Sequence, residues 1–436
     1  MDRYDWSMVE NHAAAAIAPL SDELAAKVDA SPYSRELIDR ALAVRTDRGA
    51  IEAWCDTGFP PPDQLEKYIA RQEALLTGTL RARGATWADE DMLVDLWANA
   101  PETVGDWSVT VERGPNPYAQ NRLQENPFVN VLEDHRVALG TSASSVRNAY
   151  IGGERVSVHF MSGWRIREGF RGIGLSSVLQ STPGPGYGTF GLVTYWFFRP
   201  KNASGSWMSK ITTDMGDRPE EWAIDTDLLT ATVHVVSADA GEASQGAGGS
   251  FSIRPTEARD LERCAELINR SHEGLDLFRP YSIEFLERRL EDPNWGPKPV
   301  FIPEVYGWPD HRVVEHHGEV VACAGMWQRG RDIREIWRNG DETHVEDPNA
   351  LMDFGYASEA GADALALLIR SFVGESHAQQ RSGLMAPLEF VPEVRARLDA
   401  LLIRPETREL HVMPFTSPEL TIDATITRPY IDLAYW

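Results

Sequence analysis

The stretch FRGIGLSSVL, residues 170–179, lies where one pattern of residues gives way to another. Upstream, GERVSVHFMSGWRI (153–166) alternates apolar and polar residues, which is typical of a strand. Downstream, small residues and leucines begin a helical pattern. An arginine and two glycines stand between them, and glycine lets a backbone approach a ligand closely because it carries no side chain.

The start of this predicted helix has the chemistry of an anion site. The amides of a first helical turn have no partner within the helix, and the helix dipole favours negative charge there. Arg171 adds a permanent cation that can bind a phosphate through two hydrogen bonds. Residues 171–176 are therefore predicted to bind a pyrophosphate. The alternative is a plain strand-to-helix turn in which glycine only relieves strain, since short glycine motifs are weak evidence.

Residues 166–176, IREGFRGIGLS, resemble the acetyl-CoA signature of the GCN5-related N-acetyltransferase (GNAT) superfamily. In that signature a strand ends in an aliphatic residue, an aromatic follows, and Arg/Gln-x-x-Gly-x-Gly/Ala opens a helix. Phe170, Arg171 and Gly174 occupy the aromatic, basic and glycine positions, and Ser176 replaces the usual small residue. The resemblance covers residues 80–236 well and 251–436 weakly.

The resemblance implies that acetyl-CoA, or another acyl-CoA, is the co-substrate. The pantetheine amides would pair with the backbone of a strand separated from its neighbour, at Trp164, Arg165 and Ile166. The pyrophosphate would be held by six consecutive backbone amides, those of Arg171, Gly172, Ile173, Gly174, Leu175 and Ser176. Asn202 would contact the CoA arm. The thioester would then lie between the separated strands, open to attack by an amine.

The catalytic residues are less well marked. GNAT enzymes commonly use a tyrosine in a later helix as the acid for the departing thiolate, but Ser209 stands at that place. Tyr195 in LVTYWFF is the predicted substitute, although an aromatic residue in an apolar strand is more often core. His159 is the predicted base, because histidine titrates in the useful range. The alternative for His159 is a structural, hydrogen-bonded histidine.

Three further carboxylates are alternatives for the base. Glu112 and Glu125 precede the signature, in segments that often wall the acceptor site in this family. The sequence ends IDLAYW, and a buried final segment would bring the carboxylate of Trp436 to the cleft.

The chain divides near its middle at SADAGEASQGAGGS, residues 237–250, which are small residues with nothing to bury. The parts on either side begin alike, because an arginine, an aspartate and a leucine recur 171 residues apart: Arg83, Asp89 and Leu96 match Arg254, Asp260 and Leu267. A repeat this long indicates duplicated domains.

We therefore predict a helical extension (1–80), a GNAT domain with the acyl-CoA site (81–236), a flexible linker (237–250) and a second, degenerate GNAT-like domain (251–436). The fold class is α+β, with layered helices and mixed central sheets. In the second domain Glu359 and Asp363 stand where an arginine and bare amides would be wanted. Because carboxylates repel a pyrophosphate, this domain is expected to be impaired in CoA binding.

The amino-acid composition limits which classes of molecule are expected to bind this protein. A net charge of −24 opposes nucleic-acid binding and favours a small amine-bearing substrate, although acidity can serve solubility alone. No apolar run reaches the ~18 residues of a membrane helix. Three scattered cysteines argue against disulfides, and no Cys/His spacing indicates a metal. We expect a cytoplasmic monomer or homodimer that acts as an N-acyltransferase. The alternative is a catalytically inactive CoA- or ligand-binding protein.

Overall fold

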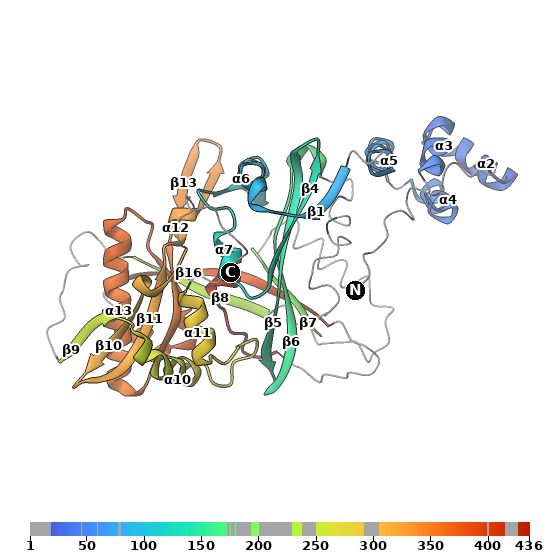
Figure 1. Cartoon of the computed structure of the whole chain (residues 1–436). Helices are drawn as coiled ribbons and strands as arrows, with labels where there is room; N and C mark the ends of the chain where they lie inside the picture. Colours follow the sequence, from blue (N-terminus) through green and yellow to red (C-terminus); the bar gives the residue numbers. More distant parts are fainter. Residues whose placement is uncertain are drawn as a thin grey trace. The chain divides into compact units, whose positions relative to one another are not determined.

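The computed structural model describes residues 19–44, 46–58, 60–76, 80–171, 175, 179, 193–199, 229–237, 250–291, 305–398, 401–414 and 426–436 (Figure 1). The chain divides into two compact units. The smaller comprises Met1–Arg83, Val131–Thr141 and Ile166–Thr182. The larger comprises Gly84–Asn130, Ser142–Arg165 and Pro183–Trp436.

The described N-terminal region is helical, as the sequence predicts. Its helices are α2 (Asp22–Ala30), α3 (Arg35–Ala43), α4 (Arg48–Thr57) and α5 (Pro62–Leu76). The side chains of Ser21, Ser34 and Asp47 each accept a hydrogen bond from the amide three residues later, which satisfies a donor at the helix start. Buried apolar residues such as Ile38 and Ile51 give these helices a core of their own.

A second small core in this unit holds the residues that follow the glycine-rich stretch. Leu175 and Leu179 are helical and buried, and they pack with Leu132 and Leu139. A spacing of four residues places two side chains on one helix face. The expected helix after residue 174 is therefore present at both of its described positions.

One large mixed sheet runs in the order β1-β4-β5-β6-β7-β16-β8-β15-β14-β11-β10-β9. Its strands from the first half of the chain are β1 (Leu80–Gly84), β4 (Pro127–Asp134), β5 (Val137–Ile151), β6 (Glu154–Ile166), β7 (Val193–Phe198) and β8 (Leu229–Ser237). Those from the second half are β9 (Phe251–Pro255), β10 (His311–His316), β11 (Glu319–Trp327), β14 (Asn349–Tyr356), β15 (Leu384–Ala386) and β16 (Leu402–Pro414). Strand β16 lies between β7 and β8, so the two halves share this sheet.

A smaller sheet also joins the two halves. Its order is β13-β12-β3-β2, with β2 (Glu102–Val104), β3 (Trp107–Arg113), β12 (Ile333–Asn339) and β13 (Glu342–Glu346). Strands β3 and β12 pair antiparallel from Arg113/Ile333 to Ser108/Arg338. Because β3 and β12 are far apart in the chain, residues from distant parts of the sequence meet here.

The predicted repeat is visible in the elements that open each half. Strand β1 is followed by η1 (Trp87–Asp89) and α6 (Glu90–Ala98), and β9 by η4 (Ala258–Asp260) and α10 (Leu261–Ser271). In each turn the aspartate accepts a hydrogen bond from the amide three residues earlier, at 2.7 Å for Thr86 and 2.9 Å for Glu257. The repeated aspartate thus performs the same capping task twice.

Helices α10 and α11 (Ile283–Leu290) cover one face of the second-half strands, and α13 (Ser358–Ala378) covers the other (Figure 1). The other described elements are α7 (Ala119–Arg122), α12 (Arg329–Asp332) and α14 (Pro392–Arg395), with 3-10 turns η2 (Glu168–Phe170), η5 (Trp308–Asp310), η6 (Leu388–Phe390), η7 (Ala396–Leu398) and η8 (Leu433–Tyr435). Cys323 and Met352 face the core that includes α10 and α11, whereas Ala322 and Leu351 face α13. The layered α/β fold is confirmed. No helix among the described residues is long and apolar enough to cross a membrane.

Candidate active site

Strands β6 and β7 begin side by side and then separate. They run parallel and pair only from Val158/Val193 to Phe160/Tyr195, although β6 continues to Ile166 and β7 to Phe198. The separation predicted from the sequence is therefore present, immediately before the glycine-rich stretch.

Glycine is required at one point of the separated part of β6. Gly163 has a φ of +65°, a conformation that other residues adopt at a cost. A Cβ there would lie 3.3 Å from Cβ of Ala143 and 3.7 Å from Cζ2 of Trp97. Both the backbone conformation and the close neighbours therefore favour glycine at this position of β6.

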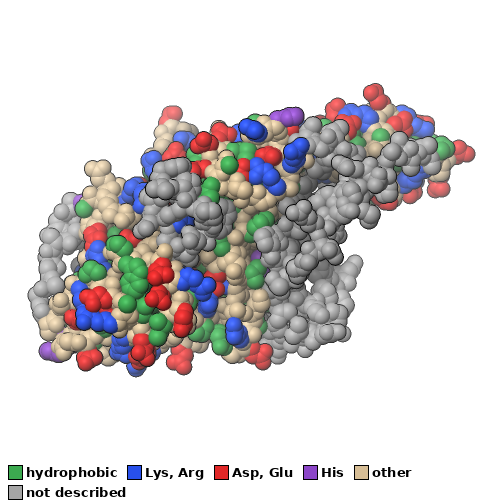
Figure 2. All heavy atoms as spheres, in the orientation of Figure 1, with side chains coloured by type: hydrophobic (Ala, Val, Ile, Leu, Met, Phe, Trp, Pro, Cys, Tyr) green, Lys and Arg blue, Asp and Glu red, His purple; other side chains and the backbone are tan. Residues whose placement is uncertain are grey.

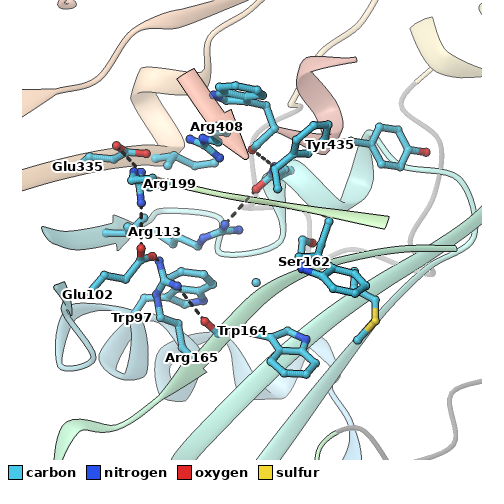
Figure 3. A pocket seen from close by; sticks show the side chains of 18 of the residues that line it. Trp97, Glu102, Arg113, Ser162, Trp164, Arg165, Arg199, Glu335, Arg408 and Tyr435 are labelled. Atoms are coloured by element: carbon cyan, nitrogen blue, oxygen red, sulfur yellow. Dashed lines mark hydrogen bonds and ion pairs between the residues drawn. The ribbon is translucent and has the colours of Figure 1, made fainter. Parts of the chain in front are cut away.

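A cavity of about 130 Å³ lies where the strands separate (Figure 3). Its wall comes from β6, β7, the small sheet, and the segments around α6, α7, α12, β16 and η8. The lining residues are Trp97, Glu102, Val111, Arg113, Gln120, Phe160, Met161, Ser162, Gly163, Trp164, Arg165, Trp196, Phe197, Arg199, Arg329, Ile333, Glu335, Arg408, Tyr435 and Trp436. Both halves of the chain thus build one cavity within the larger unit.

Arg199 is the centre of an ion-pair network in this wall. Its Nη1 atom lies 3.2 Å from Oε2 of Glu102, and its Nη2 atom lies 2.6 Å from Oε2 of Glu335. Arg165 also contacts Glu102, and Nη2 of Arg329 lies 3.2 Å from Oε1 of Glu335. Two glutamates are therefore the ion-pair partners of three arginines.

The positive charges of two further arginines in the wall are less well balanced by carboxylates. Arg113 donates to Oε1 of Gln120 at 3.0 Å and lies over the Trp97 ring. Burial, followed by the nearby guanidinium of Arg329, lowers the pKa of Arg113 to about 9. Arg408 lies 3.0 Å from Oε1 of Glu406, and burial lowers its pKa to about 10. Like charges thus crowd the cavity.

The final residues are held in the cavity wall by α7 and by the residues just after it. Nε2 of Gln120 donates to the main-chain oxygen of Trp436 at 2.7 Å, and Nε2 of Gln124 donates to that of Ala434 at 2.7 Å. Asp432 is anchored by Nη2 of Arg289 at 3.1 Å. The expected burial of the IDLAYW segment is therefore observed, with Trp436 5% exposed.

The predicted CoA-binding residues separate into three groups. Trp164 and Arg165 line the cavity. Ile166 packs with the leucines of the smaller unit, where Arg171 is exposed and donates from Nε to the carbonyl of Ile166 at 3.0 Å. Leu175 is buried in the helix. The other predicted contacts lie outside the described residues: Gly172, Ile173, Gly174, Ser176 and Asn202.

The predicted catalytic residues lie on the adjacent strands β6 and β7 but on opposite faces of the sheet, since His159 pairs with Thr194 and Tyr195 with Phe160, and neither lines the cavity. His159 is 6% exposed, its Nδ1 atom lies 3.3 Å from Oγ1 of Thr194, and burial lowers its pKa to about 4. The hydroxyl of Tyr195 accepts a hydrogen bond from Nη2 of Arg147 at 2.9 Å. Tyr195 is 1% exposed, and burial raises its pKa. Their catalytic roles stay predictions.

The alternative carboxylates are engaged elsewhere. Glu112 lies 3.2 Å from Nη1 of Arg334, and Glu125 contacts Arg279. Neither belongs to the cavity wall. In the second half, Glu359 and Asp363 both contact Arg397 at the start of α13, so their charge is partly compensated there. Among the described residues, no group of His, Cys, Asp and Glu has the arrangement of a metal site.

No protein-family model matches this sequence, and no curated protein matches it. Among solved structures, Saccharomyces cerevisiae N-myristoyltransferase with bound myristoyl-CoA and inhibitors is similar, with a TM-score of 0.50 and 8% identity over 81% of this chain and 87% of that one. GCN5-related N-acetyltransferases from Sphaerobacter thermophilus (TM-score 0.40, 14% identity, 82% and 99% covered) and Kribbella flavida (0.39, 13%, 76% and 71%) also match. At such identities the likeness concerns the fold alone, and it supports the predicted fold.

Proposed function

We propose that this chain is an acyl-CoA-dependent N-acyltransferase that moves an acetyl or other acyl group to the amine of a small molecule. The observation that carries the proposal is the cavity at the point where β6 and β7 separate. A thioester that enters between the two strands would present its carbonyl carbon to this cavity. The similar N-myristoyltransferase structure holds myristoyl-CoA, which supports an acyl-CoA as the donor.

The proposed position of CoA follows the direction of β6. Its pantetheine arm would lie along the backbone of Trp164, Arg165 and Ile166, and its pyrophosphate would reach residues 171–176. Arg171 is an exposed residue at the end of this path and would contribute its guanidinium to the phosphates. Leu175, within this stretch, and Leu179, just after it, are helical, which supports a helix N-terminus as the anion site.

The reaction forms a C–N bond and breaks the C–S bond of the thioester. The amine must lose a proton before or during its attack on the carbonyl carbon, and the departing thiolate takes one up. His159 is the proposed proton acceptor and Tyr195 the proposed donor, each acting on the reacting atoms through water, because neither lines the cavity.

A CoA-binding protein without catalysis is the second candidate. It is favoured by the position of His159 and Tyr195 outside the cavity wall. Titration calorimetry with acetyl-CoA and a thiol-release assay with a panel of amines separate the two functions. Thiol release that depends on both substrates supports the transferase, whereas tight binding of acetyl-CoA without release supports the binding protein.

The pyrophosphate site is tested by Gly174→Glu, which adds a carboxylate where the phosphates would lie. We expect a loss of acetyl-CoA affinity of at least ~100-fold, because charge repulsion and steric exclusion act together. The matched control is Gly169→Glu, since a Cβ at Gly169 would meet no atom within 4 Å. If Gly174→Glu bound acetyl-CoA as tightly as the wild type, the pyrophosphate would not bind at residues 171–176.

A further inference from the structure

Among the residues that the structure describes, more cations than anions lie at the cavity. Its five arginines are Arg113, Arg165, Arg199, Arg329 and Arg408. Their carboxylate partners are Glu102, Glu335 and Glu406. Even with a carboxyl group counted at Trp436, four anions face five cations. The nearby Glu346 does not redress this, because it is paired with Arg404 at 2.8 Å.

Three of these arginines also have donor atoms without a partner among the described residues. The atoms are Nε of Arg113, Nη1 of Arg329 and Nε of Arg408, all fully enclosed. The three residues are only 9%, 4% and 9% exposed. A buried donor without an acceptor is unfavourable, because it has lost its hydrogen bonds to water, so an occupant with acceptor oxygens would be favoured here.

The three guanidiniums lie close together. Arg329 is near enough to Arg113 and to Arg408 for its charge to lower the pKa of each. Figure 3 shows Arg113, Arg199 and Arg408 around the same space. This differs from the face of the larger unit drawn in Figure 2, where acidic and basic side chains are interspersed. A buried cluster of like charge is costly for folding, and such clusters are typical of ligand sites.

The side chains of the cavity wall favour a ligand that carries a carboxylate. A guanidinium presents parallel N–H groups that match the two coplanar oxygens of a carboxylate. The remaining wall is largely aromatic, with Phe160, Trp164, Trp196 and Phe197 available to pack against an apolar part of the same molecule. The phosphates of CoA are the other possible source of anionic oxygens, but in the proposed function they lie at residues 171–176.

We propose that Arg113, Arg329 and Arg408 bind the carboxylate of the acceptor, so that the acceptor is an amino acid or another small amine that bears a carboxylate. The proposal rests on the proposed acyl transfer and names its substrate class. The proposal also refines the expectation, based on net charge, that the substrate is a small amine. The overall charge of −24 favours a cationic partner at long range, but salt screens that field beyond ~10 Å, and the cavity's own charges govern binding inside it.

The first test uses the unaltered protein. Titration calorimetry without CoA compares a panel of small and aromatic amino acids with their carboxamides, which keep the amine and lose the carboxylate. We expect the acids to bind roughly 10- to 100-fold more tightly, the effect of one or two hydrogen bonds to a charged group. Absence of this difference, whether both forms bind or neither does, overturns the proposal. The assay does not depend on turnover, so acyl transfer can fail independently.

The second test uses Arg329→Gln. Glu335 keeps Arg199 as its partner in this variant, so we expect the fold to persist. The preference for acids over carboxamides should fall at least ~10-fold, while acetyl-CoA affinity stays unchanged. Arg334→Gln is the matched control, because Arg334 is a half-exposed arginine on β12, five residues further along the chain and outside the cavity wall. Weaker acetyl-CoA binding with an unchanged acid preference would assign the arginines to CoA and overturn the proposal.

Discussion

Nη2 of Arg199, at the end of β7, lies 2.6 Å from Oε2 of Glu335 on β12, so a buried ion pair links the large sheet to the small one. Burial alone would raise the pKa of Glu335, but the guanidiniums of Arg199, Arg329 and Arg408 outweigh it and lower the pKa to about 2. The carboxylate is therefore the anion that permits so many arginines to gather at one cavity.

Glu335→Gln should destabilise the fold by about 3 kcal/mol at pH 7, because it increases the cation surplus. A carboxyl whose pKa falls on folding stabilises the fold fully above its ordinary value of 4.5. This contribution is lost as the pH falls toward 2. Urea unfolding should thus show a difference between wild type and variant that narrows from pH 4.5 downward. Glu112→Gln, in a half-exposed ion pair, should cost less than ~1 kcal/mol. Equal losses in the two variants would contradict the buried network.

Gly163→Ala tests the bend in β6. The positive φ should cost about 1–2 kcal/mol, and the contact with Ala143 should add to this cost. Gly152→Ala is the control, since Gly152 has a φ of +58° but its added Cβ would meet no atom within 4 Å. Thermal unfolding should show the larger loss at Gly163, accompanied by weaker acetyl-CoA binding only there. The same loss at both positions would mean that the bend tolerates a side chain.

The local features of the site were predictable because short stretches of consecutive residues determine them. Strand β6 alternates its side chains over 154–166, and the glycine-rich stretch follows it directly. The 171-residue repeat likewise reflects a local task, namely capping by Asp89 and Asp260. Short-range patterns of this kind specify elements and their ends.

The arginine cluster was not predicted because its members meet only through long-range pairing. Arg113 ends β3 and Arg329 begins α12, while Arg408 lies on β16, which inserts between β7 and β8. Consecutive strands are the usual neighbours in a sheet. Sequence order therefore predicts neither the pairing of β3 with β12 nor the insertion of β16 between β7 and β8. One local clue existed: Arg113 is in phase with buried Val109 and Val111, so the apolar face of β3 ends in an arginine.

His159 should make the protein sensitive to mild acid. Burial lowers its pKa from 6.5 to about 4, so the unfolded chain binds a proton at a pH where the folded chain does not. Stability therefore falls as the pH drops from above 6.5 toward 4, by about 2 kcal/mol between pH 8 and pH 5 from this residue. His159→Asn should remove that part of the loss in urea unfolding, and His135→Asn should not, because His135 is 81% exposed. If His159 is the catalytic base, kcat/KM should titrate near pH 4.

Trp436 offers a different proton acceptor, and it can be tested directly. Its main-chain oxygen accepts a hydrogen bond from Gln120 in the cavity wall. In a protein that ends at Trp436, one added alanine converts the terminal carboxylate into an amide and moves the charge. A carboxylate base predicts a fall in kcat of at least ~100-fold with little change in acetyl-CoA affinity. Retention of kcat would exclude this carboxylate as the base.

Tyr195→Phe separates a structural role from a catalytic one. The hydroxyl of Tyr195 accepts a hydrogen bond from Arg147, whose guanidinium also donates to the carbonyl of Leu277 at 2.9 Å. Removing the acceptor should lower stability by about 1–3 kcal/mol, because a buried cation loses a partner. Tyr150→Phe, at a half-exposed position on β5, should leave stability within ~0.5 kcal/mol of wild type. A role as the acid predicts an additional fall in kcat of at least ~100-fold, most pronounced with the poorest leaving thiolates. A kcat within threefold of wild type, together with the stability loss, would limit Tyr195 to holding Arg147 in place.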